Sequence, residues 1–147
     1  MVGSKIAGEL GNMRVSEQID ALEIMGINTK TYLILPKILA ALFTIPLLVI
    51  ISAVLGILGG KLAAVATGIV SSSQFDRGLF QYFKPYNVFF ALAKSYTFAF
   101  IISSISSFYG YYVNGGALEI GRASTKSVVV SCVLILFSDY LLSSILL

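Results

Sequence analysis

Residues 38–60, ILAALFTIPLLVIISAVLGILGG, contain no charged side chain and decide the fold class of this chain. At a rise of about 1.5 Å per residue, an α-helix of this length crosses the hydrocarbon core of a bilayer, which is about 30 Å thick. Pro36 precedes the stretch, where a helix can begin, and Pro46 lies inside it and predicts a kink. The stretch therefore predicts a transmembrane helix over 38–60.

The composition of the whole chain indicates an integral membrane protein. Of its 147 residues, 57% are hydrophobic and 12% are charged, and the mean hydropathy is +0.91. Soluble domains carry about 25% charged residues, so this chain cannot cover a globular surface with charge. The net charge of +3 includes no basic run that would indicate nucleic-acid binding. The absence of His and the single Cys132 exclude a His/Cys metal site and an internal disulfide, and Cys132 is expected to be a packing residue.

Two further apolar segments predict transmembrane helices over 87–109 and 127–147. Between the first two spans, the polar and aromatic residues 71–86 predict a loop with a short interfacial helix. Between the last two spans, residues 113–126, VNGGALEIGRASTK, predict a loop in which the glycines act as helix breakers. The expected fold is therefore an all-α integral membrane protein with about three transmembrane helices.

Small residues recur at helical spacing in two of the predicted spans. Such a face lets another helix approach closely. The alternative for the first span is that the small residues merely reflect a Gly/Ala-rich composition. Its stripe runs past Lys61, which is expected to reach the membrane interface by snorkelling. The first stripe consists of Gly56, Gly60, Ala64 and Gly68, and the packing face of the second span consists of Ala99, Ser103, Ser106 and Gly110.

The distribution of Lys and Arg predicts the orientation of the spans. Three spans place the N-terminal segment and the 111–126 loop on the same side of the membrane. The positive-inside rule places this side, which holds more basic residues, in the cytoplasm, and the C-terminus outside. The basic residues on this side are Lys5, Arg14, Lys30, Lys37, Arg122 and Lys126, and those on the other side are Lys61, Arg77 and Lys84.

Residues 16–26, SEQIDALEIMG, predict a short acidic amphipathic helix just before the first span. Ser16 suits the N-cap, and Gly26 suits the end of the helix. At about 100° per residue, the helix has one apolar face and an acidic face opposite to it. The apolar face consists of Ile19, Leu22 and Met25, and the acidic face consists of Glu17, Asp20 and Glu23.

Ile24 does not follow this division, because it projects between Asp20 and Glu17, next to Ala21. An apolar residue ringed by acids is typical of an anchor for a soluble protein partner. The alternative is a helix that lies on the membrane surface, with Ile24 incidental. Anionic lipid would repel the acids, and membrane-surface helices favour Lys and Arg. We therefore favour the protein partner.

Two ionisable residues, Lys94 and Asp139, lie inside predicted spans, where each needs a partner. Lys94 is about seven residues from the outer start of its helix, and Asp139 is about twelve residues from the inner start of the next. These positions place the two side chains roughly 20 Å and 18 Å above the inner face. If the spans pack together, the two residues are expected to form an ion pair whose first role is to stabilise the structure. A transport-linked pair and an unpaired Lys94 that snorkels outward are the alternatives.

Longer stretches of the chain resemble a known family. GELGNMRVSEQIDALEIMGIN at 8–28, followed by TYLILPKILA at 31–40, is similar to the MlaE-type permease family of lipid ABC transporters. The segments at 92–131 and 138–147 also resemble it, with a lysine–serine pair early in one span, an FYGY-like span end, a GRATT-like loop and an aspartate in the last span. The resemblance covers essentially the whole chain and is weakest over 61–86.

The resemblance implies a transport function that depends on partners. Members of the family form dimers and pair with two cytoplasmic ATPase subunits, which bind the ATP, so no cofactor is expected on this chain. A periplasmic protein with mammalian-cell-entry domains usually docks outside. The complex moves phospholipids or related lipids between the bacterial inner membrane and the outer envelope, along a path expected at the dimer centre. The sequence itself contains no P-loop, nucleophile elbow or dinucleotide motif, which disfavours an enzyme.

The resemblance also assigns a role to the acidic helix. In the family this segment is the coupling helix that sits in a groove of the ATPase. Carried over to this chain, the candidate coupling residues are Glu17, Gln18, Asp20, Ala21, Glu23, Ile24 and Gly26. Helical periodicity and charge independently indicate that Ile24 faces a partner.

Family members have about five membrane helices preceded by an interfacial helix, and this chain resembles their C-terminal portion. We therefore expect one permease domain over 1–147 that is incomplete at its N-terminus. The small residues at the start, from Gly3 to Gly11, resemble the end of a helix rather than its beginning, and no signal-peptide h-region precedes the first charges. The alternative function is a non-transporting membrane scaffold or an inactive permease fragment.

Overall fold

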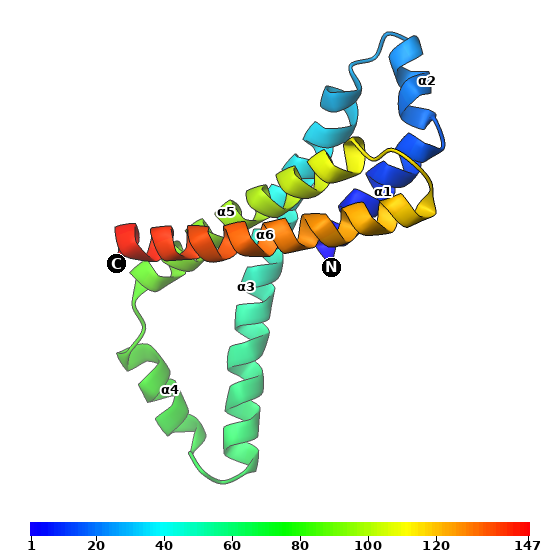
Figure 1. Ribbon diagram of the computed structural model, residues 1–147. Coiled ribbons are helices and arrows are strands. Elements are labelled where there is room, and N and C mark those ends of the chain that lie inside the picture. The colour runs from blue at the N-terminus through cyan, green and yellow to red at the C-terminus, as the bar shows by residue number, and fades with distance from the viewer.

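The protein is entirely helical in the computed structural model, which describes all 147 residues (Figure 1). Three helices are long and apolar enough to cross a membrane, which confirms the predicted all-α fold with three spans. In chain order the elements are α1 (Val2–Val15), α2 (Gln18–Ile24), the π-helical turn η1 (Lys30–Ile34), α3 (Leu35–Ala66), α4 (Ser72–Gln81), α5 (Pro85–Tyr111) and α6 (Ala117–Leu146).

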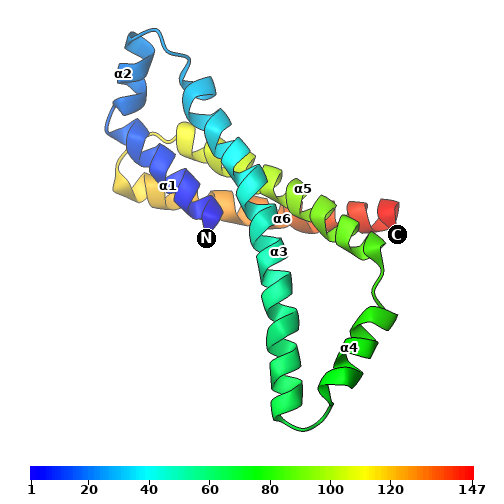
Figure 2. The same ribbon diagram turned by 180° about the vertical axis from the view of Figure 1, so that it is seen from behind.

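Helices α1, α5 and α6 lie side by side, and α3 crosses them (Figures 1 and 2). Helices α5 and α6 run in opposite directions, and the Tyr86 hydroxyl at the start of α5 donates a hydrogen bond to the Leu146 carbonyl at the end of α6. The opposite end of the molecule, which we call the α2 end, holds α2, the ends of α1 and α5 and the starts of α3 and α6. Helix α2 and the connection after α5 therefore share one end, as the sequence predicted, whereas the start of α1 lies beside the middle of the spans (Figure 1).

The interface between α1 and α5 is built from small residues. A Cβ added at Gly110 would lie 2.6 Å from the Ala7 carbonyl oxygen and 2.9 Å from Ala7 Cα, so the two backbones are in direct contact. Gly3 makes a similar approach, because a Cβ there would lie 2.7 Å from the Ser106 hydroxyl oxygen. Ala99 and Ser103, from the predicted packing face, have no exposed surface. Small residues on one face of α5 thus allow α1 to pack closely.

The third span begins at Ala117, so the predicted loop over 113–126 is largely helical. Gly121 lies inside α6 and does not break it, contrary to the sequence-based prediction. Gly116 is in an extended conformation at the N-cap, and Glu119 in the first turn interacts favourably with the positive helix end. A single interior glycine costs about 1 kcal/mol relative to alanine, which the rest of a long helix can offset.

The first span also extends beyond its predicted limits, because η1 and α3 form one helical segment from Lys30 to Ala66. The π-helical turn precedes Pro36, which lacks an N–H group and whose ring crowds the carbonyl of Tyr32. The axis of α3 changes direction along its length in Figure 2, and Pro46 is the one proline in its interior. The kink expected at this proline explains the change of direction.

The second half of α3 and the short helix α4 project away from the other helices (Figures 1 and 2). A Lys61 Nζ–Asp76 Oδ1 distance of 2.8 Å joins the two projecting helices, so Lys61 is held by an ion pair as well as lying near a span end. Helix α4 confirms the short helix predicted over 71–86, and Ser71 caps it. Gly68 does not continue the small-residue stripe, because α3 ends at Ala66 and Gly68 has a φ of +71°.

We predict that Gly110→Ala separates α1 from α5 and lowers the free energy of unfolding by about 2 kcal/mol, a typical cost of overpacking. Gly121→Ala is the matched control, since a Cβ there meets nothing within 4 Å and alanine favours the helix by about 1 kcal/mol. Thermal unfolding of both variants in detergent measures the difference. Equal midpoints for the two variants would contradict the tight α1–α5 contact.

Candidate functional site

Helix α2 spans Gln18–Ile24 and is shorter than the predicted helix over 16–26. Ser16 is not its N-cap, because the Ser16 hydroxyl donates a 2.8 Å hydrogen bond to the Asn12 carbonyl and thereby closes α1. Glu17 is the N-cap residue and has a left-handed backbone, with a φ of +64°. Such a conformation is uncommon for a residue with a side chain, and it sets α2 at an angle to α1. Gly26, with a φ of +79°, follows the end of the helix as predicted.

The exposed apolar residue of α2 is Ile24, as the sequence predicted. Its relative exposure is 87%, whereas Ile19 on the opposite side of the helix is fully buried. Ala21 is also exposed, and Leu22 is half-buried. Met25 departs from the prediction, because it lies just beyond the helix and is largely exposed. The helix is therefore anchored to the protein through Ile19 and presents Ile24 outward.

The acidic residues of α2 interact with the rest of the chain. Arg14, from the last turn of α1, lies 3.4 Å from Asp20 and 3.9 Å from Glu23, measured from its Nη1 to the nearest carboxylate oxygen. The Tyr111 hydroxyl, from the end of α5, donates a hydrogen bond of 3.3 Å to Glu23. Glu17 is exposed and belongs to no ion pair. Half of the Asp20 and Glu23 side-chain surface is still accessible, so these acids remain available to a partner.

Arg14 and Tyr111 are functional candidates that sequence reasoning did not single out. In the sequence, Arg14 contributes only to the predicted orientation of the spans, and nothing distinguishes Tyr111 from the tyrosines beside it. The basic residue in the last turn of α1, six positions before Asp20, was the available signal for the first contact. No sequence pattern indicated the second contact, because Glu23 and Tyr111 are separated by 88 positions.

Lys94 of α5 and Asp139 of α6 lie together within the membrane-spanning part of the structure. The Lys94 Nζ lies 2.6 Å from Asp139 Oδ1 and 4.3 Å from the centre of the Phe90 ring. The antiparallel packing of two consecutive spans brings them to the same depth, which is the geometry that the sequence predicted. In a low-dielectric environment each charge requires such a partner.

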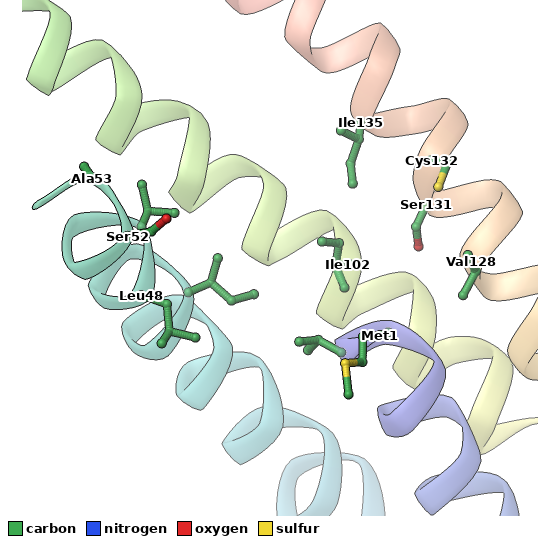
Figure 3. A pocket seen from close by; sticks show the side chains of 13 residues that line it. Met1, Leu48, Ser52, Ala53, Ile102, Val128, Ser131, Cys132 and Ile135 are labelled. Atoms are coloured by element: carbon green, nitrogen blue, oxygen red, sulfur yellow. The ribbon is translucent and has the colours of Figure 1, made fainter. Parts of the chain in front are cut away.

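An apolar cavity of about 730 Å³ opens between the start of α1 and the helices α3, α5 and α6 (Figure 3). Most of its wall is aliphatic, and the few polar atoms include the Ser52 and Ser131 hydroxyls; the Ser131 oxygen is buried and has no hydrogen-bond partner. Cys132, expected to be a packing residue, is a free and exposed thiol that lines the cavity. Other residues of the wall are Leu48, Val49, Ile102, Val128 and Ile135.

Two residues of the predicted small-residue stripe on α3, Gly56 and Gly60, contact no other helix of this chain. A Cβ added at Gly56 or Gly60 would meet nothing within 4 Å, and both residues are exposed. Ala64 is half-buried near α4. This part of α3 therefore presents small residues and apolar side chains to the surroundings of the molecule. The chain contains no cluster of His, Cys, Asp and Glu that could hold a metal ion.

These features define a helical membrane protein with several spans, a polar surface helix at one end and an apolar cavity between the spans. The family model for Permease MlaE matches residues 1–145. The chain therefore belongs to the MlaE permease family, which confirms the resemblance inferred from the sequence.

Individual relatives agree with this family membership. A probable ABC transporter permease protein of Rickettsia bellii is 45% identical over 144 residues, which cover 98% of this chain and 56% of the relative. The protein TRIGALACTOSYLDIACYLGLYCEROL 1, chloroplastic, of Arabidopsis thaliana is 35% identical over 97% of this chain and 41% of its own length. A probable ABC transporter permease of Synechocystis is 33% identical, over 97% of this chain and 54% of the relative. The chain thus spans about half the length of the curated relatives it matches.

We predict that Lys94→Gln destabilises the protein by about 3 kcal/mol, because it leaves the Asp139 carboxylate without its cation in the membrane. The double variant Lys94→Gln/Asp139→Asn removes both charges. Its loss of stability is expected to be smaller than that of Lys94→Gln alone. Unfolding in mixed micelles, with Asp139→Asn as the fourth corner of the cycle, measures the coupling. A double variant whose loss of stability equals or exceeds the sum of the two single losses would exclude an energetic pair.

Proposed function

We propose that this chain is the transmembrane permease subunit of an ABC transporter for phospholipid or a related lipid. A separate cytoplasmic ATPase binds ATP and drives transport between the inner membrane and the outer envelope. The family and the names of the bacterial relatives support a permease, and the name of the Arabidopsis relative contains that of a galactolipid.

The observation that carries this proposal is the exposure of Ile24 among acidic side chains on α2. Ile24 is exposed beside acidic side chains, at the end of the molecule that the distribution of basic residues places in the cytoplasm. Ile24 suits a pocket on a soluble partner, and Glu17, Asp20 and Glu23 around it suit basic residues at the pocket rim. We assign this pocket to the ATPase, with Gln18, Ala21 and Gly26 as neighbouring contact positions.

The membrane orientation follows from the same assignment. The α2 end lies in the cytoplasm, and the C-terminus of α6 lies outside, in agreement with the distribution of basic residues. A second permease copy forms a homodimer with this chain. The exposed Gly56 and Gly60 on α3 suit a close helix contact with another subunit. A periplasmic protein with mammalian-cell-entry domains is the third partner, docking at the outer end.

The second candidate function is a non-transporting membrane scaffold or an inactive permease fragment. The observation that favours it is the match to about half the length of the relatives. A scaffold of this kind can still bind an ATPase through α2. Lipid transport by the chain together with the ATPase distinguishes the two functions, since a scaffold binds the ATPase and moves no lipid.

We predict that Ile24→Asp abolishes co-purification of the ABC ATPase encoded in the same genome while membrane insertion stays intact. The change removes the apolar anchor and adds another acid, and a loss of 30-fold or more in affinity, about 2 kcal/mol, is expected of such an anchor. Ile69→Asp is the control, because Ile69 is equally exposed but lies between α3 and α4, away from the α2 end. Unchanged co-purification of Ile24→Asp would rule out the coupling role of α2.

The cavity suits the acyl chain of the transported lipid, because its wall is apolar and it opens among the spans. We predict that Ser52→Phe, which places a ring in the cavity from α3, reduces lipid transport between vesicles about 10-fold without loss of ATPase binding. Val54→Phe is the control, since Val54 is exposed on the same helix and does not line the cavity. Equal transport by the two variants would show that lipid takes another path.

A further inference from the structure

A chain of polar contacts, buried at Thr29 and Tyr111, joins α2 to the end of α5. Thr29 and Tyr111 are 3% and 4% exposed, and their hydroxyl oxygens are 2.6 Å apart. The Tyr111 hydroxyl also lies 3.3 Å from the Glu23 carboxylate. A carboxylate only accepts hydrogen bonds, so the single phenolic proton goes to Glu23. The Thr29 hydroxyl must then donate to the Tyr111 oxygen, which fixes the direction of the chain.

Tyr111 is also in contact with α1, through Arg14. The Arg14 guanidinium lies 5.3 Å from the centre of the Tyr111 ring and also pairs with Asp20 and Glu23 of α2. The end of α1, the helix α2, the start of η1 and the end of α5 therefore meet around one side chain. Apart from these contacts, the apolar anchor of α2 is the buried Ile19.

The backbone departs from regular α-helical geometry on both sides of α2. Glu17 before it is in a left-handed conformation, Gly26 after it has a positive φ, and the π-helical turn η1 begins at Lys30. π-Helical turns and left-handed residues are local departures from regular structure that often accompany functional sites. Contacts from other elements are thus needed to fix the position of α2.

We propose that Tyr111 is a positioning residue that fixes the partner-binding helix α2 to the membrane span α5. This inference rests on the proposed function, because it gives the route by which a displacement of α2 reaches the lipid cavity. Tyr111 and the cavity residue Ile102 are on the same helix, about 14 Å apart along its axis. A rigid helix carries a movement at Tyr111 directly to the cavity wall.

The first arm of the test is Tyr111→Phe, which keeps the ring and removes the hydroxyl. Hydrogen exchange of the α2 amides, measured in detergent without any ATPase, is expected to accelerate about 10-fold relative to the α6 amides. Tyr112→Phe is the matched control, because this neighbouring hydroxyl is not bonded to α2. Thr29→Val keeps the Tyr111–Glu23 hydrogen bond and is expected to have a smaller effect than Tyr111→Phe. Unchanged α2 exchange in Tyr111→Phe would overturn the proposal.

The second arm measures coupling in the complex with the ATPase. Tyr111→Phe is expected to retain ATPase association and ATP hydrolysis, while the lipid moved per ATP falls several-fold. A parallel loss of association and hydrolysis would mean that Tyr111 is merely structural and would also overturn the proposal. If the wild-type chain does not bind the ATPase, the proposed function is refuted. In that case the hydrogen-exchange measurement alone decides whether Tyr111 fixes α2.

Discussion

The contact between the backbones of α1 and α5 is the constraint on which the rest of the structure depends. Lipid tails are as apolar as leucine, so helices in a bilayer gain little from hiding apolar side chains and associate through close packing instead. Glycine at position 110 allows this approach, and Ser106, which lies against Gly3, extends it. The contact fixes the end of α1 relative to the end of α5. It thereby determines where Arg14 and Tyr111 meet the helix between them.

Hydropathy and small-residue spacing predicted the spans and the packing face of α5, because a bilayer imposes length and polarity requirements that can be read locally. The region after Gly116 could not be predicted in the same way, since its polar composition is compatible with a loop or with a helix that leaves the membrane. The prediction for Ser16 was wrong for a related reason. A serine can begin one helix or close the preceding one, and only the three-dimensional course of the chain decides.

Those features of the candidate site that follow from the position of a residue along its own helix could be predicted from the sequence. The outward position of Ile24 follows from periodicity, and the shared depth of Lys94 and Asp139 follows from counting along antiparallel spans. The hydrogen bond between Tyr111 and Glu23 and the cavity depend on how distant segments pack. In the proposed transporter, α5 unites these features, because it carries Tyr111 at one end, Ile102 on the cavity wall and Lys94 further along.

The left-handed residue Glu17 has a mechanical consequence. If α2 continued the axis of α1, a push on α2 would compress α1 along its length, the direction in which a helix is stiffest. The change of direction at Glu17 sets α2 across that axis (Figure 1), so a push on α2 acts on α1 as a torque. A single backbone angle thus determines that a displacement of α2 acts across the axis of α1 and not along it.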